Sequence, residues 1–197
     1  MVMPITAATG AHGHYRRAAR DRGVAFERRL RPAVTLAYLG RNYVTQHACN
    51  STGDGMLRGL NPLLTPDLLH ALASMGHGDT IAVVDGNFPA VATARRLVVL
   101  PGADAPAVLD AILTLLPVDD FEPDPIAVMQ VVGDADAMPE PVRNFGAVLA
   151  RHGAPPPIAI ERHAFYRAAA TCFTIVQTGE RRFYGNILLR KGVIPPP

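Results

Sequence analysis

The chain of 197 residues has little cysteine and no long apolar run. Its two cysteines, Cys49 and Cys172, lie far apart and match no metal-binding or redox spacing, so neither a disulfide framework nor a zinc knuckle is indicated. No run of about 18 apolar residues exists that could cross a bilayer. With 49% apolar and 18% charged residues, the sequence is typical of a soluble globular protein, and a reducing cytosol is the expected compartment.

The motifs of several catalytic classes are also absent. No histidine pair four residues apart encloses a glutamate, no glycine-rich loop ends in lysine followed by serine or threonine, and no glycine fingerprint follows a strand. A nucleophile elbow is missing, and the histidines at 70, 77, 152 and 163 have no metal-ligand spacing. We therefore expect neither a metal nor a cofactor. The chemistry that remains is acid–base catalysis and hydrogen bonding.

Charge divides the chain after residue 55. Residues 1–55 hold eight arginines and three acidic residues, whereas residues 56–197 hold eleven basic and fourteen acidic ones. The basic arm has no sustained apolar period and no features of a secretory signal, so we expect it to be poorly ordered. A mitochondrial presequence and a translation start at Met56 are alternative interpretations. Nucleic-acid binding is disfavoured, because the arm lacks lysines and interleaved aromatic residues.

Helical and strand patterns alternate from Met56 onward and predict one α/β domain with a central, mostly parallel sheet flanked by helices. In the first helix Thr65 is the expected N-cap, and Gly76 is the expected left-handed C-cap. The run Thr80–Val84 is apolar on both faces and predicts a buried central strand. Further strands are expected at 97–100, 126–132, 158–160, 173–177 and 187–189, and further helices at 104–116, 139–151 and 163–170.

His77 is the first candidate for acid–base chemistry, because it lies between Gly76 and Gly78 directly after a helix. Flanking glycines let a backbone approach a ligand closely. A helix C-terminus and a nearby carboxylate both favour a protonated imidazole, and imidazole is the side chain that changes charge near neutral pH. These properties suit a general acid or base. A histidine that only caps the last carbonyls of the helix fits the spacing equally well.

Four further polar residues lie beside predicted strands. Asp85 follows a buried strand, where an acid in an α/β sheet commonly faces a ligand crevice, although capping of the following turn is slightly favoured. Tyr184 and Asn186, separated by Gly185, can donate and accept hydrogen bonds toward a polyol, although both are also ordinary turn residues. Arg162 follows a short strand and is either a ligand contact or one partner of a salt bridge to a nearby acid.

Three segments, in this order, resemble the RbsD/FucU family of ribose pyranases and fucose mutarotases. They are GLNPLLTPDLLHALASMGHGD (59–79), ERHAFY (161–166) and TGERRFYGNILLRKGV (178–193). The likeness extends over residues 56–193 and leaves the arm without a counterpart. It implies a single α/β domain, a ring-like homo-oligomer with sites where subunits meet, and interconversion of the anomers of a free monosaccharide without a cofactor.

The resemblance also implies residue roles, with His77 as the catalytic histidine. The sugar-binding positions that it implies are Asp85, Arg162, Tyr184, Gly185 and Asn186. The arginine before an aromatic pair and the Tyr-Gly-Asn order favour the fucose mutarotase branch, a cytoplasmic isomerase with no nucleic-acid or membrane partner. Asn87 stands where fucose-type members usually carry a histidine, and it cannot shuttle a proton. Ribose pyranase activity and a non-catalytic sugar-binding accessory of uptake are the alternatives.

Overall fold

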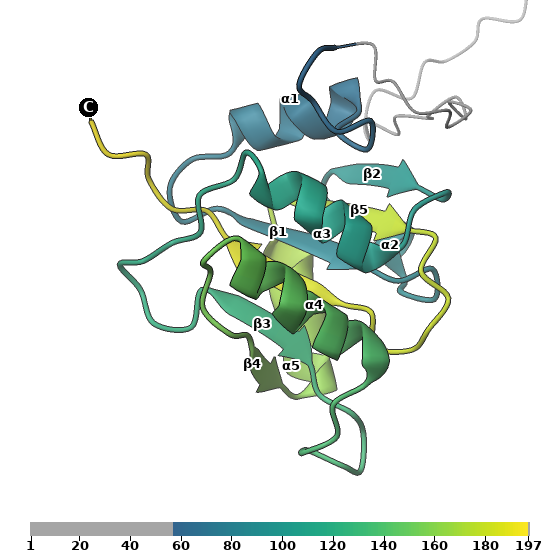
Figure 1. Ribbon diagram of the computed structural model, residues 1–197. Helices are drawn as coiled ribbons and strands as arrows, with labels where there is room; N and C mark the ends of the chain where they lie inside the picture. Colours follow the sequence, from purple (N-terminus) through teal and green to yellow (C-terminus); the bar gives the residue numbers. More distant parts are fainter. Residues whose placement is uncertain (1–56, 197) are drawn as a thin grey trace, which may run out of the picture. The chain divides into compact units, whose positions relative to one another are not determined.

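The computed structural model describes residues 57–196, and the arm predicted at 1–55 lies outside the described residues. Helices and strands alternate along the described chain (Figure 1), as the sequence predicts, except that the last two strands follow each other directly. The elements are α1 (Pro66–Ser74), β1 (Thr80–Val84), α2 (Ala90–Thr93), β2 (Leu97–Leu100), α3 (Ala105–Leu113), β3 (Ile126–Met129), α4 (Glu140–Arg151), β4 (Ile158–Ile160), α5 (Arg162–Thr171), β5 (Thr174–Thr178) and β6 (Ile187–Arg190).

The six strands form one sheet in the order β2-β5-β1-β6-β3-β4. The pairs β1–β5, β2–β5 and β3–β4 are parallel, whereas β6 is antiparallel to both β1 and β3. This reversal follows from the connection, because the chain passes from β5 to β6 through residues 179–186 without a helix. So short a link cannot return the chain to the opposite edge of the sheet. The mostly parallel sheet predicted from the sequence is confirmed.

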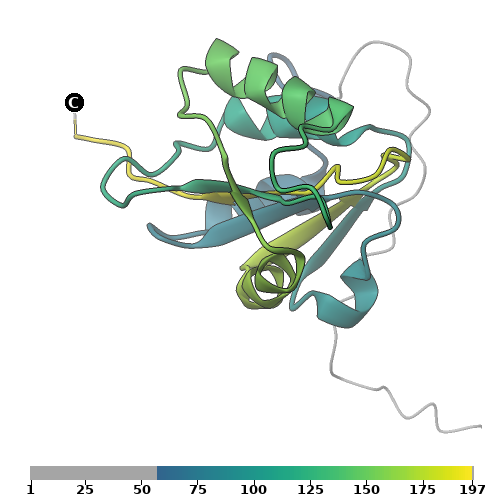
Figure 2. The ribbon, with the colours of Figure 1, turned by 90° about the horizontal axis from the view of Figure 1, so that it is seen from below.

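Both faces of the sheet are covered by helices. On β1, Ile81 and Val83 belong to the apolar core that includes residues of α1, α3 and α4, whereas Ala82 and Val84 belong to the core that includes residues of α2 and α5. Figure 2 shows α5 and α2 on the side of the sheet opposite α3 and α4. Alternate residues of a strand face opposite sides of its sheet. The apolar character of every residue from 81 to 84 is therefore explained by burial on both faces.

The first helix begins as predicted and ends differently. The Thr65 side chain accepts a hydrogen bond from the Leu68 amide (3.4 Å). At the other end the helix stops at Ser74, and its C-cap is Met75 in an extended conformation (φ −71°, ψ 135°). The prediction of a left-handed Gly76 is therefore wrong. The Gly76 amide donates instead to the Asp79 carboxylate (2.7 Å), so that side chain closes the turn.

Two further differences from the sequence prediction concern short segments. The helix α2 has four residues, too few to show a helical period, and no side chain caps its start. The strand β3 ends at Met129 instead of Val132, because Val131 forms an isolated bridge with Asp134 as the chain turns.

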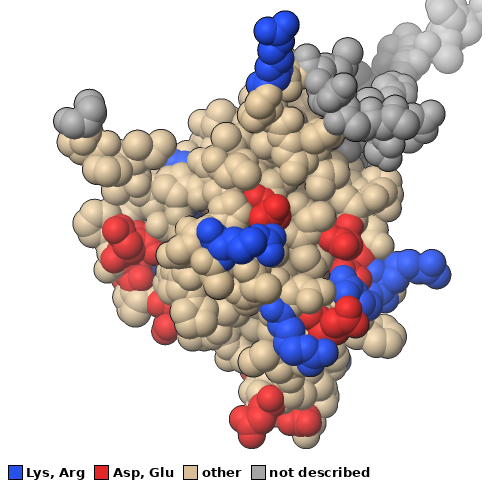
Figure 3. Space-filling model, in the orientation of Figure 1, with Lys and Arg blue, Asp and Glu red and all other residues tan. Residues whose placement is uncertain are grey.

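No helix within residues 57–196 has the length and apolar character needed to cross a membrane. On the face seen in Figure 3, basic and acidic side chains lie among one another, and no continuous basic patch is visible among the residues drawn in colour.

Candidate active site

His77 lies in the turn between α1 and β1, at the sheet edge where β1 begins. Backbone bonds fix this turn, because the Gly78 amide donates to the Lys191 carbonyl (2.9 Å) and the Lys191 amide donates to the Asp79 carbonyl (2.8 Å). Gly78 has a left-handed φ of +81°, a conformation that glycine adopts without steric cost. The His77 side chain remains 49% exposed, so its imidazole is held in place and open to solvent.

The buried partner of this imidazole is Asp119, in the loop between α3 and β3. The His77 Nε2 lies 3.3 Å from the Asp119 Oδ1, and the Asp119 side chain is fully buried. The Asp119 amide donates to the Arg190 carbonyl (3.0 Å) at the end of β6. Since Lys191 holds the His77 turn, the carboxyl end of β6 brings the two side chains together.

The Asp119 carboxylate is charged at neutral pH in spite of its burial. Burial alone raises the pKa of this carboxyl, but hydrogen bonds from the Phe121 amide (3.2 Å) and from His77, together with the charge of Arg190, lower it below the usual value. The Oδ2 atom is buried and has no hydrogen-bond partner among residues 57–196. A buried carboxylate oxygen without a partner is uncommon in folded proteins, and it leaves this group able to accept one further hydrogen bond.

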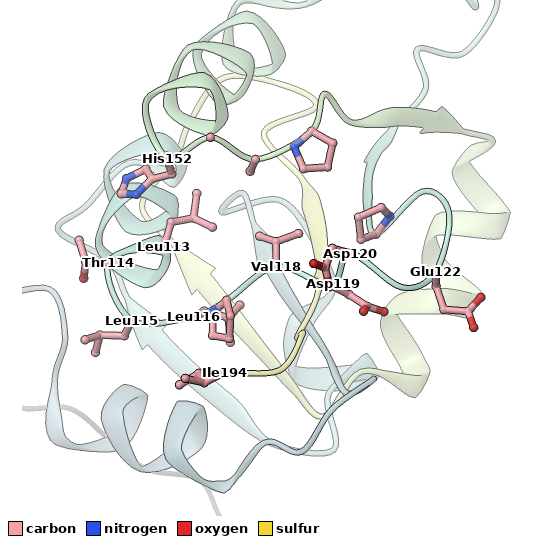
Figure 4. A pocket seen from close by; sticks show the side chains of 15 residues that line it. Leu113, Thr114, Leu115, Leu116, Val118, Asp119, Asp120, Glu122, His152 and Ile194 are labelled. Carbon is pink, nitrogen blue, oxygen red and sulfur yellow. The ribbon is translucent and has the colours of Figure 1, made fainter. Parts of the chain in front are cut away.

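An aromatic ring and a pocket lie next to this pair. The Phe121 ring is 69% exposed and packs edge-on against the His77 ring, with 5.7 Å between the ring centres. Asp119 also lines an open pocket with a volume of about 780 Å³, together with Val118, Asp120 and His152 (Figure 4). His77 is not among the lining residues.

Asp85 lies at the opposite edge of the sheet, where β1 ends, and both of its carboxylate oxygens are occupied. Oδ1 accepts hydrogen bonds from the amides of Asn87 (2.9 Å) and Phe88 (3.0 Å). Oδ2 accepts one from the Asn186 side chain (2.8 Å), whose own oxygen accepts from the Asp85 amide (3.0 Å). Burial raises the pKa of Asp85 more than these bonds lower it. Asp85 therefore caps the turn after β1 and fixes Asn186.

Tyr184 and Gly185 precede Asn186 in the loop before β6. Tyr184 has a left-handed φ of +63°, and its hydroxyl accepts a hydrogen bond from the Val132 amide (3.3 Å). A side chain at Gly185 would place its Cβ 2.7 Å from the Cγ of Glu180, a distance that real contacts do not reach. Only glycine fits at residue 185, and the three residues enter β6 in a fixed conformation.

Arg162 is the first residue of α5 and lies at the same edge as Asp85, since β1, β3 and β4 all end there. Its side chain is exposed and forms no ion pair or hydrogen bond with any residue of the described range. Tyr166 follows one helical turn later, on the same side of the helix. The Tyr166 ring lies 5.3 Å from the ring of Phe88, which belongs to the Asp85 turn.

One chain divides the predicted site residues between two edges of the sheet. His77 lies where β1 begins, whereas Asp85, Arg162, Tyr184, Gly185 and Asn186 lie where β1, β3 and β4 end. The five residues of β1, at about 3.3 Å each, separate the edges by about 17 Å. That distance exceeds the width of a monosaccharide, so a single sugar cannot contact both groups within one chain.

Two side chains that join these groups were not among the predicted site residues. Asp119 is 42 residues from its partner His77, and no motif spans such a distance, so only the fold could pair them. Tyr166 is four residues after Arg162, and this helical spacing is a signal that could have been used.

The described chain matches a known family. The sequence profile of the RbsD / FucU transport protein family covers residues 58–194, and the chain belongs to this family. It is 42% identical over 145 residues to the fucose mutarotase of Homo sapiens, a match covering 70% of this chain and 94% of that protein. It is 39% identical over 142 residues to the L-fucose mutarotase of Glaesserella parasuis serovar 5, covering 71% and 97%.

A solved structure gives the same relationship in three dimensions. The crystal structure of the fucose mutarotase from Streptococcus pneumoniae in complex with L-fucose superposes with a TM-score of 0.67 at 35% identity, covering 71% of this chain and all of that one.

Proposed function

We propose that this protein is a fucose mutarotase, an isomerase that interconverts the α and β anomers of free L-fucose. The observation that carries the proposal is the half-exposed His77 imidazole, 3.3 Å from the buried and charged Asp119 carboxylate. The names of the relatives, at about 40% identity over nearly their whole length, support the same activity.

Mutarotation requires little more than proton transfer. A base takes the proton of the anomeric hydroxyl while an acid protonates the ring oxygen, the ring opens, the carbonyl carbon rotates, and the ring closes on the other face. His77 is the group that exchanges these protons. The Asp119 carboxylate lies 3.3 Å from Nε2 and orients the imidazole, and its negative charge faces the imidazolium that forms during proton transfer, as a buried acid does for many catalytic histidines. Positioned acid–base groups contribute about a hundredfold to ten-thousandfold in rate.

The opposite edge of the sheet supplies the groups that orient the sugar. The exposed Arg162 guanidinium donates to sugar hydroxyls, and the Tyr184 phenol donates or accepts. Asp85 and Asn186 bind each other and present the Gly185 backbone in a fixed position. The Tyr166 phenol, on the same face of α5 as Arg162, is a further candidate.

A second copy of the chain completes the site in this proposal. Since about 17 Å separate His77 from the sugar-orienting residues, the two groups can serve one sugar only if they come from neighbouring subunits of a homo-oligomer. The cytosolic location expected from the cysteine spacing remains a prediction.

The test is anomer exchange followed by NMR saturation transfer, with L-fucose and D-ribose in parallel. Wild-type protein is expected to speed exchange of L-fucose, and His77→Ala is expected to lose about a hundredfold or more. His70→Ala, at an exposed histidine of α1, is the matched control and keeps full activity. Full exchange by His77→Ala would contradict the assignment. Faster exchange of ribose than of fucose would indicate a ribose pyranase, and sugar binding without faster exchange would indicate a non-catalytic accessory.

A further inference from the structure

Glu180 is a buried carboxylate for which the proposed reaction has no use. It lies in the loop between β5 and β6, and its side chain is 3% exposed. Charged side chains are almost never buried to this extent unless they are paired. The residues that it contacts lie on both sides of Tyr184, so the contacts of Glu180 show what its burial does.

The first contact of Glu180 is a two-armed pair with Arg182. The guanidinium donates from Nε to Oε1 (2.9 Å) and from Nη2 to Oε2 (2.7 Å), and the Arg182 amide also donates to Oε1 (2.9 Å). These bonds from Arg182 lower the pKa of Glu180. The remaining arm of Arg182 donates to Glu140 of α4 (2.7 Å). Forked pairs of this kind are among the strongest and most directional contacts in proteins.

The second group of contacts lies after Tyr184 and in the turn after β1. The Cγ of Glu180 fills the space in which a side chain of Gly185 would stand. The Glu180 carbonyl accepts a hydrogen bond from the Gly86 amide (2.9 Å), next to the Asp85 carboxylate that binds Asn186. Glu180 therefore touches the chain before Tyr184, the chain after it, and the turn against which this loop packs.

Tyr184 needs such support because of its backbone. Tyr184 and Asp124 are the non-glycine residues with a positive φ between 57 and 196. A left-handed conformation is unfavourable for a bulky L-residue, and it persists only where the surroundings enforce it. On one side Arg182 is held by Glu180, and on the other Asn186 is held by Asp85.

We propose that Glu180 is a positioning residue that holds Tyr184 in its left-handed conformation and thereby sets the direction of the Tyr184 phenol toward the sugar. This inference rests on the proposed function for the sugar, but the conformation of Tyr184 can be tested without it. Glu180 acts on the loop through its two side-chain hydrogen bonds with Arg182. The exposed Glu140 binds the remaining N–H group of the same guanidinium.

The experiment compares Glu180→Gln with Glu140→Gln. In Glu180→Gln, glutamine keeps the shape of the side chain but turns an NH₂ group toward one N–H group of the guanidinium. Glu140 is 61% exposed, and Glu140→Gln affects only the hydrogen bond between Arg182 and residue 140. Glu180→Gln is expected to raise the KM for L-fucose about tenfold and to change kcat much less, because His77 lies at the other edge. Glu140→Gln is expected to change KM less than about twofold.

The conformation itself is measured in crystal structures of both variants. In Glu180→Gln, Tyr184 is expected to leave the positive φ region and its hydroxyl to lose the Val132 amide, whereas Glu140→Gln keeps both features. A lower apparent kcat of Glu180→Gln with an unchanged KM would mean only that less of the protein is folded, and that result overturns the proposal. A wild-type KM together with a wild-type φ in Glu180→Gln also overturns it.

A second variant covers the case in which Glu180→Gln does not fold. Arg182→Lys keeps a positive charge beside the buried carboxylate but replaces the fork by a single ammonium group. It is expected to raise KM and to release Tyr184, and unchanged values of both would refute the role of Glu180. If the wild-type protein does not speed anomer exchange, the proposed function fails, but equilibrium binding of L-fucose and the crystal structures still decide the positioning role.

Discussion

The two edges of the sheet contain similar polar groups in opposite states. At the edge where β1 begins, the His77 imidazole is half exposed and its hydrogen bond to Asp119 is 3.3 Å long. One oxygen of Asp119 has no partner among residues 57–196. At the edge where β1 ends, Asp85 is buried and both of its oxygens are bonded at 3.0 Å or less. We call the first the open edge, because the His77–Asp119 pair has hydrogen-bonding capacity to spare. We call the second the closed edge, because the Asp85 carboxylate there is fully bonded, although Arg162 at the same edge is exposed.

This difference separates two requirements of a sugar isomerase. A group that exchanges protons needs access to the substrate and spare hydrogen-bonding capacity, whereas groups that orient a sugar act best when they are already fixed. In the proposed function each requirement is met at its own edge, which avoids a conflict between them within one chain. Under that proposal neither edge alone is a complete site.

The sharpest test of this division is complementation between two inactive variants. His77→Ala removes the proton-exchanging edge, and Arg162→Ala removes an exposed residue from the sugar-orienting edge without disturbing a described contact. Each variant alone is expected to lose most of its activity. Co-expressed in equal amounts, they should form intact sites at about a quarter of the interfaces of a homo-oligomer, measured as restored anomer exchange.

Two controls limit the interpretation of that result. Either single variant expressed alone must show no restored anomer exchange. The double variant His77→Ala/Arg162→Ala mixed with wild type must give no more anomer exchange than the wild-type protein in the mixture accounts for. Activity of the mixture no higher than that of the single variants would show that the two edges do not meet in one site.

Within the open edge, Asp119→Asn is expected to reduce kcat about tenfold to a hundredfold with KM nearly unchanged. The amide keeps the shape of the carboxylate but lacks the negative charge that faces His77 during proton transfer. Asp120→Asn, the exposed neighbour, serves as the matched control. A kcat of Asp119→Asn within twofold of the wild-type value would remove the carboxylate from the mechanism.

At the closed edge, a substitution of Asp85 is expected to lower the stability of the fold more than a substitution of Asp119 does. Asp85→Asn keeps only one acceptor oxygen, so its NH₂ group faces either the backbone amides or the Asn186 side-chain amide. Both of these donate to the carboxylate, so either arrangement leaves buried donors unpaired. Loss of such bonds costs about 1–3 kcal/mol, measured as the free energy of unfolding in urea. A comparable loss of stability in Asp119→Asn, whose Oδ2 has no described partner, would contradict the comparison.

The pH dependence of stability gives the smallest difference. The pKa values of Asp119 and Glu180 lie below their ordinary values of 3.8 and 4.5. Both groups therefore stabilise the fold above those ordinary values, and this contribution is lost as the pH falls through the lower, folded values. Asp85 has a raised pKa, so its contribution has the opposite sign and declines as the pH rises through its folded value.

Unfolding free energies between pH 7 and pH 3 test these signs. Glu180→Gln is expected to flatten the loss of stability on the acid side. Asp85→Asn is expected to leave that acid loss at least as steep as in the wild type, because it removes a group that opposes the loss. If stability fell equally little between pH 7 and pH 3 in both variants, Glu180 and Asp85 would not differ in the direction of their pKa shifts.

The sequence predicted most of the fold because its local signals agree with one another. Thr65 and Asp104 both cap helices with their side chains, as residues of these types do at helix starts. The apolar run before Asp85 is a central strand of the sheet. The left-handed glycine was misplaced, because the Asp79 side chain closes the turn, and this choice depends on the tertiary bond between Gly78 and Lys191.

The site was predicted in part. The capping role of Asp85 was foreseen as one of two interpretations, and the structure has its three hydrogen bonds. The pairing of His77 with Asp119, and the distance between the two edges, depend on the position of β6 between β1 and β3. No local pattern in Ile187–Arg190 distinguishes an antiparallel strand from a parallel one, so the sequence could not reveal either feature.

The length of strand β6 limits which mutations this protein can accept. Its four residues enter the sheet directly after Asn186 and leave it where the Arg190 and Lys191 carbonyls bind the Asp119 and Gly78 amides. A deletion of one residue would turn every following side chain to the other face and would also shift one edge relative to the other. Substitutions can therefore tune each edge separately, but the length of this strand is common to both and cannot be altered for the benefit of one.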